Sequence, residues 1–472
     1  MREFLVTFET FFNNAIFYYA MFIMGSYVVL ALLSAIEMRS YMKKNSYVNY
    51  REILVSPLAP SVSILAPAYN EAAIIIENVR SLLSLHYGNY EVIIINDGST
   101  DGTFQLMSDY YQLEKVDFAV GYQIKCNEIL GVYKSKLPSF SKLTVVNKVN
   151  GGKSDALNAG INVSAKDLIL CVDVDCIVQE DTILKLAKPY LEEKYQVIAT
   201  GGVVRIANSC KVEEGRLVEV NVPKNFWSRF QVLEYIRAFL MRRMAWSKLN
   251  GLLIISGAIG LFDKNIVIKV GGYNVRTVGE DMELVIRMRR YMCEHSKRFK
   301  IIYIPDPLCW TEAPADLQLL GRQRNRWTRG TIESLWMHKD LFFNPKYGIL
   351  GMLSYPYWFF FEWLAPIIEF LGISVFILLA LLGHIDWEFS LTLIIMVYFF
   401  SLTLSTVAVV FEEMSYKQYT KGGDLIKLLL VAFLEPIIFH PLTIYWAIKG
   451  NIHKFLGKNS WGAMPRKGFK NA

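Results

Sequence analysis

Long uncharged apolar runs mark both ends of this chain of 472 residues, and a charged region lies between them. The first run, residues 15–38, holds 23 uncharged residues and one glutamate. That is enough to cross a hydrocarbon core of about 30 Å at about 1.5 Å per residue, and too long for a cleaved signal peptide. Arg39, Lys43 and Lys44 follow at once. The positive-inside rule therefore predicts that this end of the helix, and the region after it, face the cytosol.

Three further apolar runs close the chain, at residues 347–383, 389–411 and 425–448, and each is long enough to span a bilayer. The first contains Pro356 and Pro366, and it is either an interfacial helix leading into one span or a broken pair of short spans. One crossing there would leave the basic tail outside, whereas two would return it to the cytosol, the side that its lysines and arginines favour. Ionisable groups within these runs face protein, a water-filled path or the headgroups: Glu362, Glu369, Glu435 and His440.

The region between the apolar ends alternates short apolar runs with amphipathic stretches. The runs predict strands at 61–66, 91–96, 143–147, 167–172 and 196–203, and the stretches predict helices at 72–85, 102–113 and 154–161. This alternation is typical of a doubly wound α/β sheet, in which ligands bind at the carboxyl ends of the strands. Residues 114–141 break the alternation, and we interpret them as an inserted loop region.

Composition and charge narrow the classes of function. The chain is 53% apolar and 14% aromatic, which is too apolar for a soluble pair of domains. The chain has 50 Lys and Arg and 43 Asp and Glu, a modest basic excess. The basic residues gather near the ends of the apolar runs, which indicates anionic lipid and a phosphorylated substrate as partners rather than nucleic acid. Six cysteines without a CxxC pair are typical of reduced cytosolic thiols.

Polar residues follow the first two predicted strands. Glu71 comes shortly after the first strand, and Asp97 ends the second. Either carboxylate is suited to accept hydrogen bonds from the base or ribose of a nucleoside. Turn and cap chemistry would place the same residue types here, because Asp-Gly and Ser-Thr-Asp-Gly are common turn formers.

The fourth predicted strand runs into Asp173-Val174-Asp175. Two carboxylates one residue apart at the end of a buried strand would repel each other unless a divalent cation lies between them and a diphosphate. We expect Asp175 to coordinate the metal, and Asp173 to contact the sugar nucleotide or act as a second ligand. Lys153 opens the preceding helix, where its ammonium and the backbone amides can neutralise a diphosphate.

Two helical stretches supply further candidates. Glu280 and Asp281 begin one helix, where acids are favoured by the helix dipole in any protein; transfer to a hydroxyl group also needs a base, and Asp281 is our candidate. In the second stretch, Gln323, Arg326 and Trp327 share one face. An indole beside an arginine suits a sugar ring and a departing diphosphate, although this amphipathic helix would also dock on a membrane surface.

Taken in order, Asn96-Asp97-Gly98, Asp173-Val174-Asp175, Gly279-Glu280-Asp281 and Gln323-x-x-Arg326-Trp327 resemble the D, DxD, TED and QxxRW motifs of the processive family 2 glycosyltransferases. That group includes cellulose, hyaluronan, chitin and poly-N-acetylglucosamine synthases. Gly279 stands where the family usually has threonine, which removes a side chain that helps to orient the base.

The resemblance implies a type A glycosyltransferase fold, a Rossmann-like nucleotide-sugar-binding sheet, flanked by transmembrane helices. It implies that Asp97 contacts the nucleoside and that Asp173 and Asp175 hold the diphosphate and Mg²⁺ or Mn²⁺. Together with Glu71 and Lys153, which their positions after a strand and at a helix start suggest, these residues form the expected UDP-sugar site. Asp281 is then the base of an inverting transfer. The residues implied for the acceptor and diphosphate are Ser256, Gly257, Gln323, Arg326 and Trp327.

We therefore expect a transmembrane helix and its flank at 1–44, and a cytosolic catalytic domain at 45–345 with an interfacial helix near 317–343. Membrane helices follow at 346–449, and a basic tail at 450–472. The expected enzyme lies in the inner membrane among lipids, polymerises a β-linked glycan, with UDP-N-acetylglucosamine as the best match to the resemblance, and helps to translocate the product. A small membrane or export subunit is left open, and so are two alternatives: transfer of one sugar to a lipid or lipid-linked acceptor, and a non-catalytic scaffold subunit.

Overall fold

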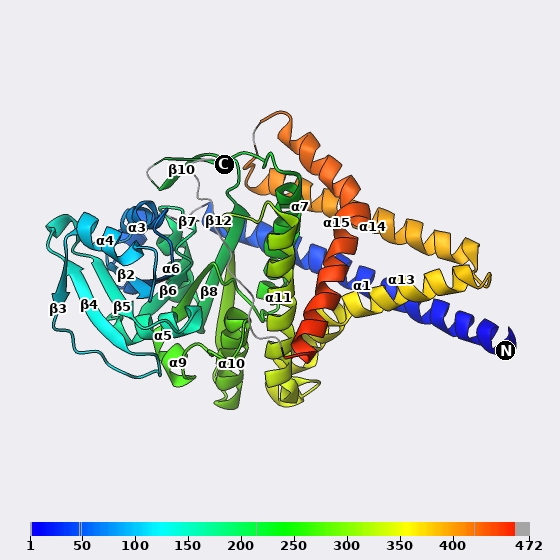
Figure 1. Ribbon diagram of the computed structural model, residues 1–472, viewed down its shortest axis with the longest axis horizontal. Helices are drawn as coiled ribbons and strands as arrows, with labels where there is room; N and C mark the ends of the chain where they lie inside the picture. Colours follow the sequence, from blue (N-terminus) through cyan, green and yellow to red (C-terminus); the bar gives the residue numbers. More distant parts are fainter. Residues whose placement is uncertain (1, 47, 49, 214, 420, 458–472) are drawn as a thin grey trace.

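The computed structural model describes residues 2–46, 48, 50–213, 215–419 and 421–457. An α/β domain lies at one end of the molecule, and long apolar helices extend from it to the other end (Figure 1). The basic tail was predicted at 450–472; its residues up to Phe455 belong to the last helix, and residues 458–472 lie outside the described residues.

A ten-stranded sheet forms the centre of the domain, in the order β3-β4-β5-β2-β1-β6-β11-β8-β12-β7. Its middle strands β5, β2, β1 and β6 are parallel, whereas β11 is antiparallel to both of its neighbours, β6 and β8. The strands β1 and β6 are almost fully buried, as expected for apolar strands covered on both faces. Because the middle strands are parallel, the residues that follow them meet at one edge of the sheet. The strands are β1 (Val62–Ala68), β2 (Tyr90–Asp97), β3 (Leu113–Val116), β4 (Ile129–Ser135), β5 (Leu143–Lys148), β6 (Leu168–Val172), β7 (Ile177–Val178), β8 (Gln196–Ile206), β11 (Ile259–Asp263) and β12 (Phe299–Thr311), with a separate hairpin of β9 (Lys211–Glu213) and β10 (Arg216–Glu219).

The predicted α/β architecture is confirmed, and each of the five predicted strands overlaps an observed strand. The interpretation of residues 114–141 as a loop region is wrong in part, because β3 and β4 lie there. β3 pairs antiparallel with β4, and β4 pairs antiparallel with β5. Most positions of these two strands are partly buried or exposed, so they lack the continuous apolar run that marks the central strands.

Helices pack around this sheet and connect it to the membrane helices. The three predicted helices are α3, α4 and α5, and α5 packs on β1 and β2. In the domain the helices are α2 (Tyr50–Val55), α3 (Ile75–Leu83), α4 (Thr103–Tyr111), α5 (Lys153–Val163), α6 (Thr182–Glu192), α7 (Phe226–Tyr235), η2 (Ile236–Arg242), α8 (Arg243–Lys248), α9 (Lys264–Lys269), α10 (Glu280–Glu294) and α11 (Leu317–Met337), with short turns η1 (Pro138–Phe140), η3 (Lys339–Leu341) and η4 (Pro345–Tyr347).

Four helical segments of the described chain are long and apolar enough to cross a membrane: residues 7–45 of α1 (Arg2–Asn45), Leu350–Leu381, α14 (Trp387–Ser415) and α15 (Asp424–Phe455). The run predicted at 347–383 forms one such segment rather than two. It consists of η5 (Leu350–Ser354), α12 (Tyr355–Tyr357), η6 (Trp358–Trp363) and α13 (Ala365–Leu381), in which η5 and η6 are π-helical.

Candidate active site

A small pocket opens where β6 ends and the loop before β11 passes beside it. Five of the residues predicted for the site line it, from α5, from the end of β6, from the loop before β11 and from the start of α10. The lining residues are Pro67, Lys153, Leu157, Cys171, Val172, Asp173, Ser256, Gly257, Tyr273, Glu280 and Asp281. Glu71, Asp97, Asp175, Gln323, Arg326 and Trp327 do not line it.

Lys153, the first residue of α5, joins the acidic groups of the pocket. Its Nζ lies 2.5 Å from Asp173 Oδ1 and 3.5 Å from Glu280 Oε1, and it donates to the carbonyl of Gly257 at 3.0 Å. Burial alone would lower the pKa of Lys153, but Asp173 and Glu280 outweigh it and raise the pKa. The ammonium is therefore held in the charged form, which is the form that binds a diphosphate.

Glu280 and Asp281 begin α10 side by side, and their surroundings differ. Glu280 is buried, and this burial raises its pKa; Asp281 adds to the rise, whereas Lys153 and Arg326 oppose it. Asp281 is half-buried, its Oδ1 accepts from the amide of Met282 at 2.8 Å, and its Oδ2 would lie 3.1 Å from a Cβ placed on Gly257. Glycine at 257 thus keeps the space in front of the Asp281 carboxylate open to a reacting group.

Asp97 is enclosed by internal donors. Its carboxylate accepts from Lys148 Nζ at 2.6 Å and from the amides of Gly151 and Gly152 at 3.0 and 2.8 Å. Lys148 is fully buried and also pairs with Asp155 at 2.7 Å. The carboxylate therefore holds the loop that leads to Lys153, and direct contact of Asp97 with a nucleoside stays a prediction.

The two acids after β6 differ in accessibility. Asp173 has a side chain that is 30% exposed and faces the pocket, whereas Asp175 is buried. No cluster of three or more His, Cys, Asp or Glu side chains suited to a metal occurs among the described residues. Two carboxylates one residue apart nevertheless fit Mg²⁺ or Mn²⁺, because Mg²⁺ usually takes one or two protein carboxylates together with substrate phosphates.

The predicted helix around Gln323 is confirmed as α11, which Asp316 caps by accepting from the amides of Gln318 and Leu319. Gln323 Oε1 is buried and has no hydrogen-bond partner among the described residues. Arg326 lies near enough to influence both Lys153 and Glu280.

Trp327 is 39% exposed, and Arg324 packs against its ring. The guanidinium of Arg324 lies 4.2 Å from the ring centroid of Trp327 and forms two bonds of 2.7 Å to Glu234 of α7. The pattern of residues 323–327 did not identify Arg324 as functional, because its partner is about ninety positions away in the sequence.

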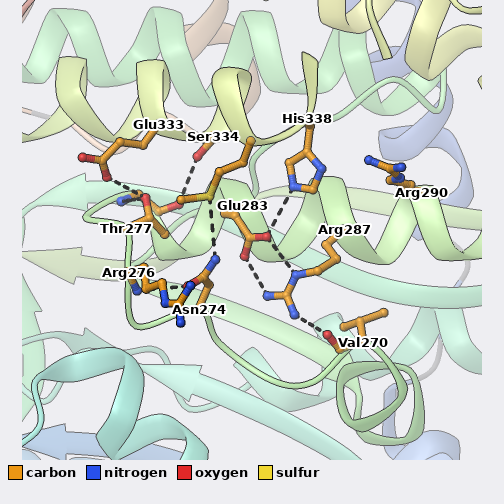
Figure 2. A network of polar contacts seen from close by, with 12 residues as sticks. Val270, Asn274, Arg276, Thr277, Glu283, Arg287, Arg290, Glu333, Ser334 and His338 are labelled. Carbon is orange, nitrogen blue, oxygen red and sulfur yellow. Dashed lines mark hydrogen bonds and ion pairs between the residues drawn. The ribbon is translucent and has the colours of Figure 1, made fainter. Parts of the chain in front are cut away.

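Hydrogen bonds that the sequence did not reveal connect the loop before α10 to α11 (Figure 2). Thr277 donates to Glu333 at 2.9 Å, the amide of Val278 donates to the same carboxylate at 2.9 Å, and the amide of Gly279 donates to Thr277 Oγ1 at 3.0 Å. Thr277 thus supplies a hydroxyl group two residues before the position where the family usually has threonine.

Gly279 and Gly330 meet without side chains between them. A Cβ on Gly279 would lie 2.7 Å from the Cα of Gly330, and a Cβ on Gly330 would lie 2.8 Å from the Cα of Gly279. A threonine at 279 would therefore collide with α11. The two backbones approach so closely that only glycine fits at 279, where the family usually has threonine.

A second set of contacts holds α10 one turn further along (Figure 2). Glu283 is buried, accepts from Arg287 at 2.8 and 2.7 Å, and lies 3.3 Å from His338 at the end of α11. Arg287 also donates to the carbonyls of Val270 and Gly272. The start of α10 is thus fixed to the loop on one side and to α11 on the other.

Two family profiles match the chain. That of glycosyl transferase family 2 covers residues 63–248, and that of glycosyl transferase family group 2 covers residues 168–411, more than half of the chain. Together they include every residue that was predicted for the site.

The chain is also similar to poly-beta-1,6-N-acetyl-D-glucosamine synthases. It is 26% identical to that of Staphylococcus aureus (strain COL) over 310 residues, 66% of this chain and 62% of the relative. It is 26% identical to that of Staphylococcus epidermidis over 274 residues, 58% of this chain and 55% of the relative. A solved mannosyltransferase from Pyrobaculum calidifontis, in complex with GDP-Man and Mn²⁺, has a TM-score of 0.47 and 16% identity over 92% of this chain and 99% of that chain.

Proposed function

Because this chain belongs to the glycosyl transferase family group 2, we propose that it moves a sugar from a nucleotide-sugar donor to a hydroxyl group, with inversion at the anomeric carbon and with a divalent metal. It is a glycosyltransferase and an integral membrane protein with four candidate spans. We place it in the inner membrane with its catalytic domain in the cytosol, on the basis of Arg39, Lys43 and Lys44 after the first apolar run.

The observation that carries the proposal is the position of Lys153 between Asp173, Glu280 and the carbonyl of Gly257. Asp173 and Asp175 would hold Mg²⁺ or Mn²⁺, which when bound neutralises the diphosphate. Lys153 then exchanges its contact with Asp173 for an oxygen of the diphosphate and orients the bond to be broken. Carboxylates line the site and would repel a bare diphosphate. A diphosphate that binds together with its metal ion suits the site better.

Asp281 acts as the base. The acceptor oxygen forms a bond to the anomeric carbon, the bond from that carbon to the diphosphate breaks, and the acceptor proton moves to the Asp281 carboxylate. One displacement of this kind inverts the anomeric configuration. The open space at Gly257 admits the acceptor hydroxyl group, and Gln323, Arg326 and Trp327 orient the acceptor and the leaving diphosphate.

We propose that the product is a β-linked polysaccharide built from N-acetylglucosamine, and that the membrane helices help to translocate it. Support comes from the similarity to the poly-beta-1,6-N-acetyl-D-glucosamine synthases, of which this chain spans about 62% of the length. Transfer of a single sugar to a lipid or lipid-linked acceptor remains the second enzyme function to test. A scaffold role is disfavoured, because the carboxylates of the motifs are all present and five predicted site residues line one pocket.

The test is release of nucleoside diphosphate by purified protein in lipid discs with Mg²⁺ or Mn²⁺. UDP-N-acetylglucosamine, UDP-glucose and UDP-glucuronate are offered separately, and the products are sized. We expect turnover of UDP-N-acetylglucosamine into long chains and loss of turnover in Asp173→Asn. One sugar per acceptor would support the lipid transferase instead, and no turnover of any donor would contradict the proposal.

A further inference from the structure

α15 is long and apolar enough to cross a membrane, but both of its ends are attached to the catalytic domain. Three residues before its start, Lys421 Nζ lies 2.6 Å from Glu219 of β10. Near its end, Lys454 Nζ lies 2.8 Å from Glu333 of α11. A helix that begins and ends on the same soluble domain does not carry the chain across a bilayer.

The other apolar segments do lead away from the domain and back to it. Tyr347, before the segment that contains α13, donates to Glu294 of α10 at 3.0 Å. At the far end of that segment, the amide of Asp386 donates to Glu9 of α1 at 3.0 Å. α14 then returns to the sheet, where Glu412 pairs with Arg205 of β8. The turn between α13 and α14 and the start of α1 thus lie together at the end of the molecule opposite the sheet (Figure 1).

The second half of α15 follows α11 over more than two turns. Trp446 packs on Gly321, Gly450 on Thr328, and His453 lies 3.2 Å from Asn325. α11 is rich in arginine (Arg322, Arg324, Arg326 and Arg329), so it cannot lie in the hydrocarbon core without a large cost. The half of α15 that packs along α11 is excluded from that depth as well. Figure 1 shows the second half of α15 running across α1 and α13.

The face of α15 opposite these contacts is exposed and mostly apolar; it also carries His440, which lies 2.8 Å from Glu369 of α13, and Phe433, whose ring packs on Tyr398 of α14. Its exposed residues recur at helical spacing and are 50–60% exposed: Ile426, Leu430, Phe433, Ile437, Tyr445 and Ile452. Lys427 and Lys449 are also exposed, where they can meet anionic headgroups. This pattern is typical of a helix that lies in the membrane interface with one face among the acyl chains.

We propose that α15 is an interfacial helix that anchors the catalytic domain to one leaflet, and that the chain crosses the membrane three times, through α1, α13 and α14. The partner of its apolar face is the lipid of the leaflet next to the domain. The chain after Phe455 then starts on the same side of the membrane as the active site, which agrees with its basic character. The second half of α15 also touches α11 directly, through Lys454 and Glu333.

Cysteine labelling in sealed vesicles tests the number of crossings. Single cysteines are placed at Leu456 after α15, at Lys194 in the domain and at Glu388 at the far end of α14, all exposed, in a background with Cys126 and Cys293 changed to serine. A membrane-impermeant maleimide should label Leu456→Cys and Lys194→Cys from one side and Glu388→Cys from the other. Labelling of Leu456→Cys together with Glu388→Cys would overturn the proposal.

Depth measurement tests the lipid contact independently of sidedness. Fluorophores on Ile426→Cys, Ile437→Cys and Ile452→Cys are quenched by lipids brominated at known positions. An interfacial α15 places all three at one shallow depth, above a label on Val397→Cys in the middle of α14. A crossing helix would instead place residue 437 deeper than residue 426 by up to about 16 Å, at 1.5 Å per residue, and that result would also overturn the proposal.

Discussion

Gly330→Ala should slow the reaction although alanine is normally the better helix residue. In a helix interior, alanine is favoured over glycine by up to about 1 kcal/mol. At this position the new Cβ would lie 2.8 Å from the Cα of Gly279, whereas ordinary contacts begin at 3.4 Å. α10 must therefore shift by about 0.6 Å relative to α11, and such overpacking costs roughly 1–3 kcal/mol.

That shift is transmitted to Asp281, two residues after Gly279. A misplacement of about 1 Å can lower a rate by about a hundredfold, so we expect kcat to fall about tenfold or more while the donor KM changes little. The assay is nucleoside diphosphate release with the melting temperature measured in parallel. Gly25→Ala is the matched control, because it makes the same change inside a helix where a Cβ meets nothing within 4 Å. A folded Gly330→Ala with the kcat of the wild type would refute the reasoning.

Three further predictions concern the same site. Burial raises the pKa of Glu280, so lowering the pH through that pKa removes one of the partners of Lys153; the donor KM should fall in acid in the wild type, but not in Glu280→Gln. Lys153→Met should raise the donor KM about tenfold to a hundredfold in titrations of initial rate, because a hydrogen bond to a charged group contributes about 1.5–3 kcal/mol. Burial would raise the pKa of Glu333, but its bonds to Lys454, Val278 and Thr277 outweigh this and lower it. The stability that Glu333 adds should therefore be present at neutral pH and be lost as the pH falls below about 4.3, which thermal melts of the wild type and Glu333→Gln can measure.

The central sheet was predictable because its strands are continuous apolar runs, and their carboxyl ends located the candidate acids. β4 was missed because glycine and exposed lysine interrupt it, and β12 because Pro305 and Pro307 break its pattern, where the pairing with β8 is irregular. Hydropathy predicted a span at 425–448, and α15 covers these residues and is long and apolar enough to cross a membrane. The contacts that both ends of this helix make with the catalytic domain are invisible to a sliding window.

The motifs pointed to Lys153, Asp173 and Asp281, each of which stands at the end of a strand or the start of a helix, and all three line one pocket. Sequence could not show that Asp97 faces inward to Lys148, since that depends on how the loop after β5 folds over the end of β2. Nor could it show that Glu333 fastens the loop before α10, because Thr277, Glu333 and Lys454 come together only in the folded chain.

The most direct test of the catalytic account is to compare the turnover of Asp281→Asn with that of the wild type at saturating donor and metal, with donor affinity measured separately. General base catalysis is worth about 10²–10⁴-fold, so we predict a loss of that size in kcat with the donor Kd unchanged. Asp281→Asn with kcat within a few-fold of the wild type would contradict the assignment of the base and the mechanism built on it.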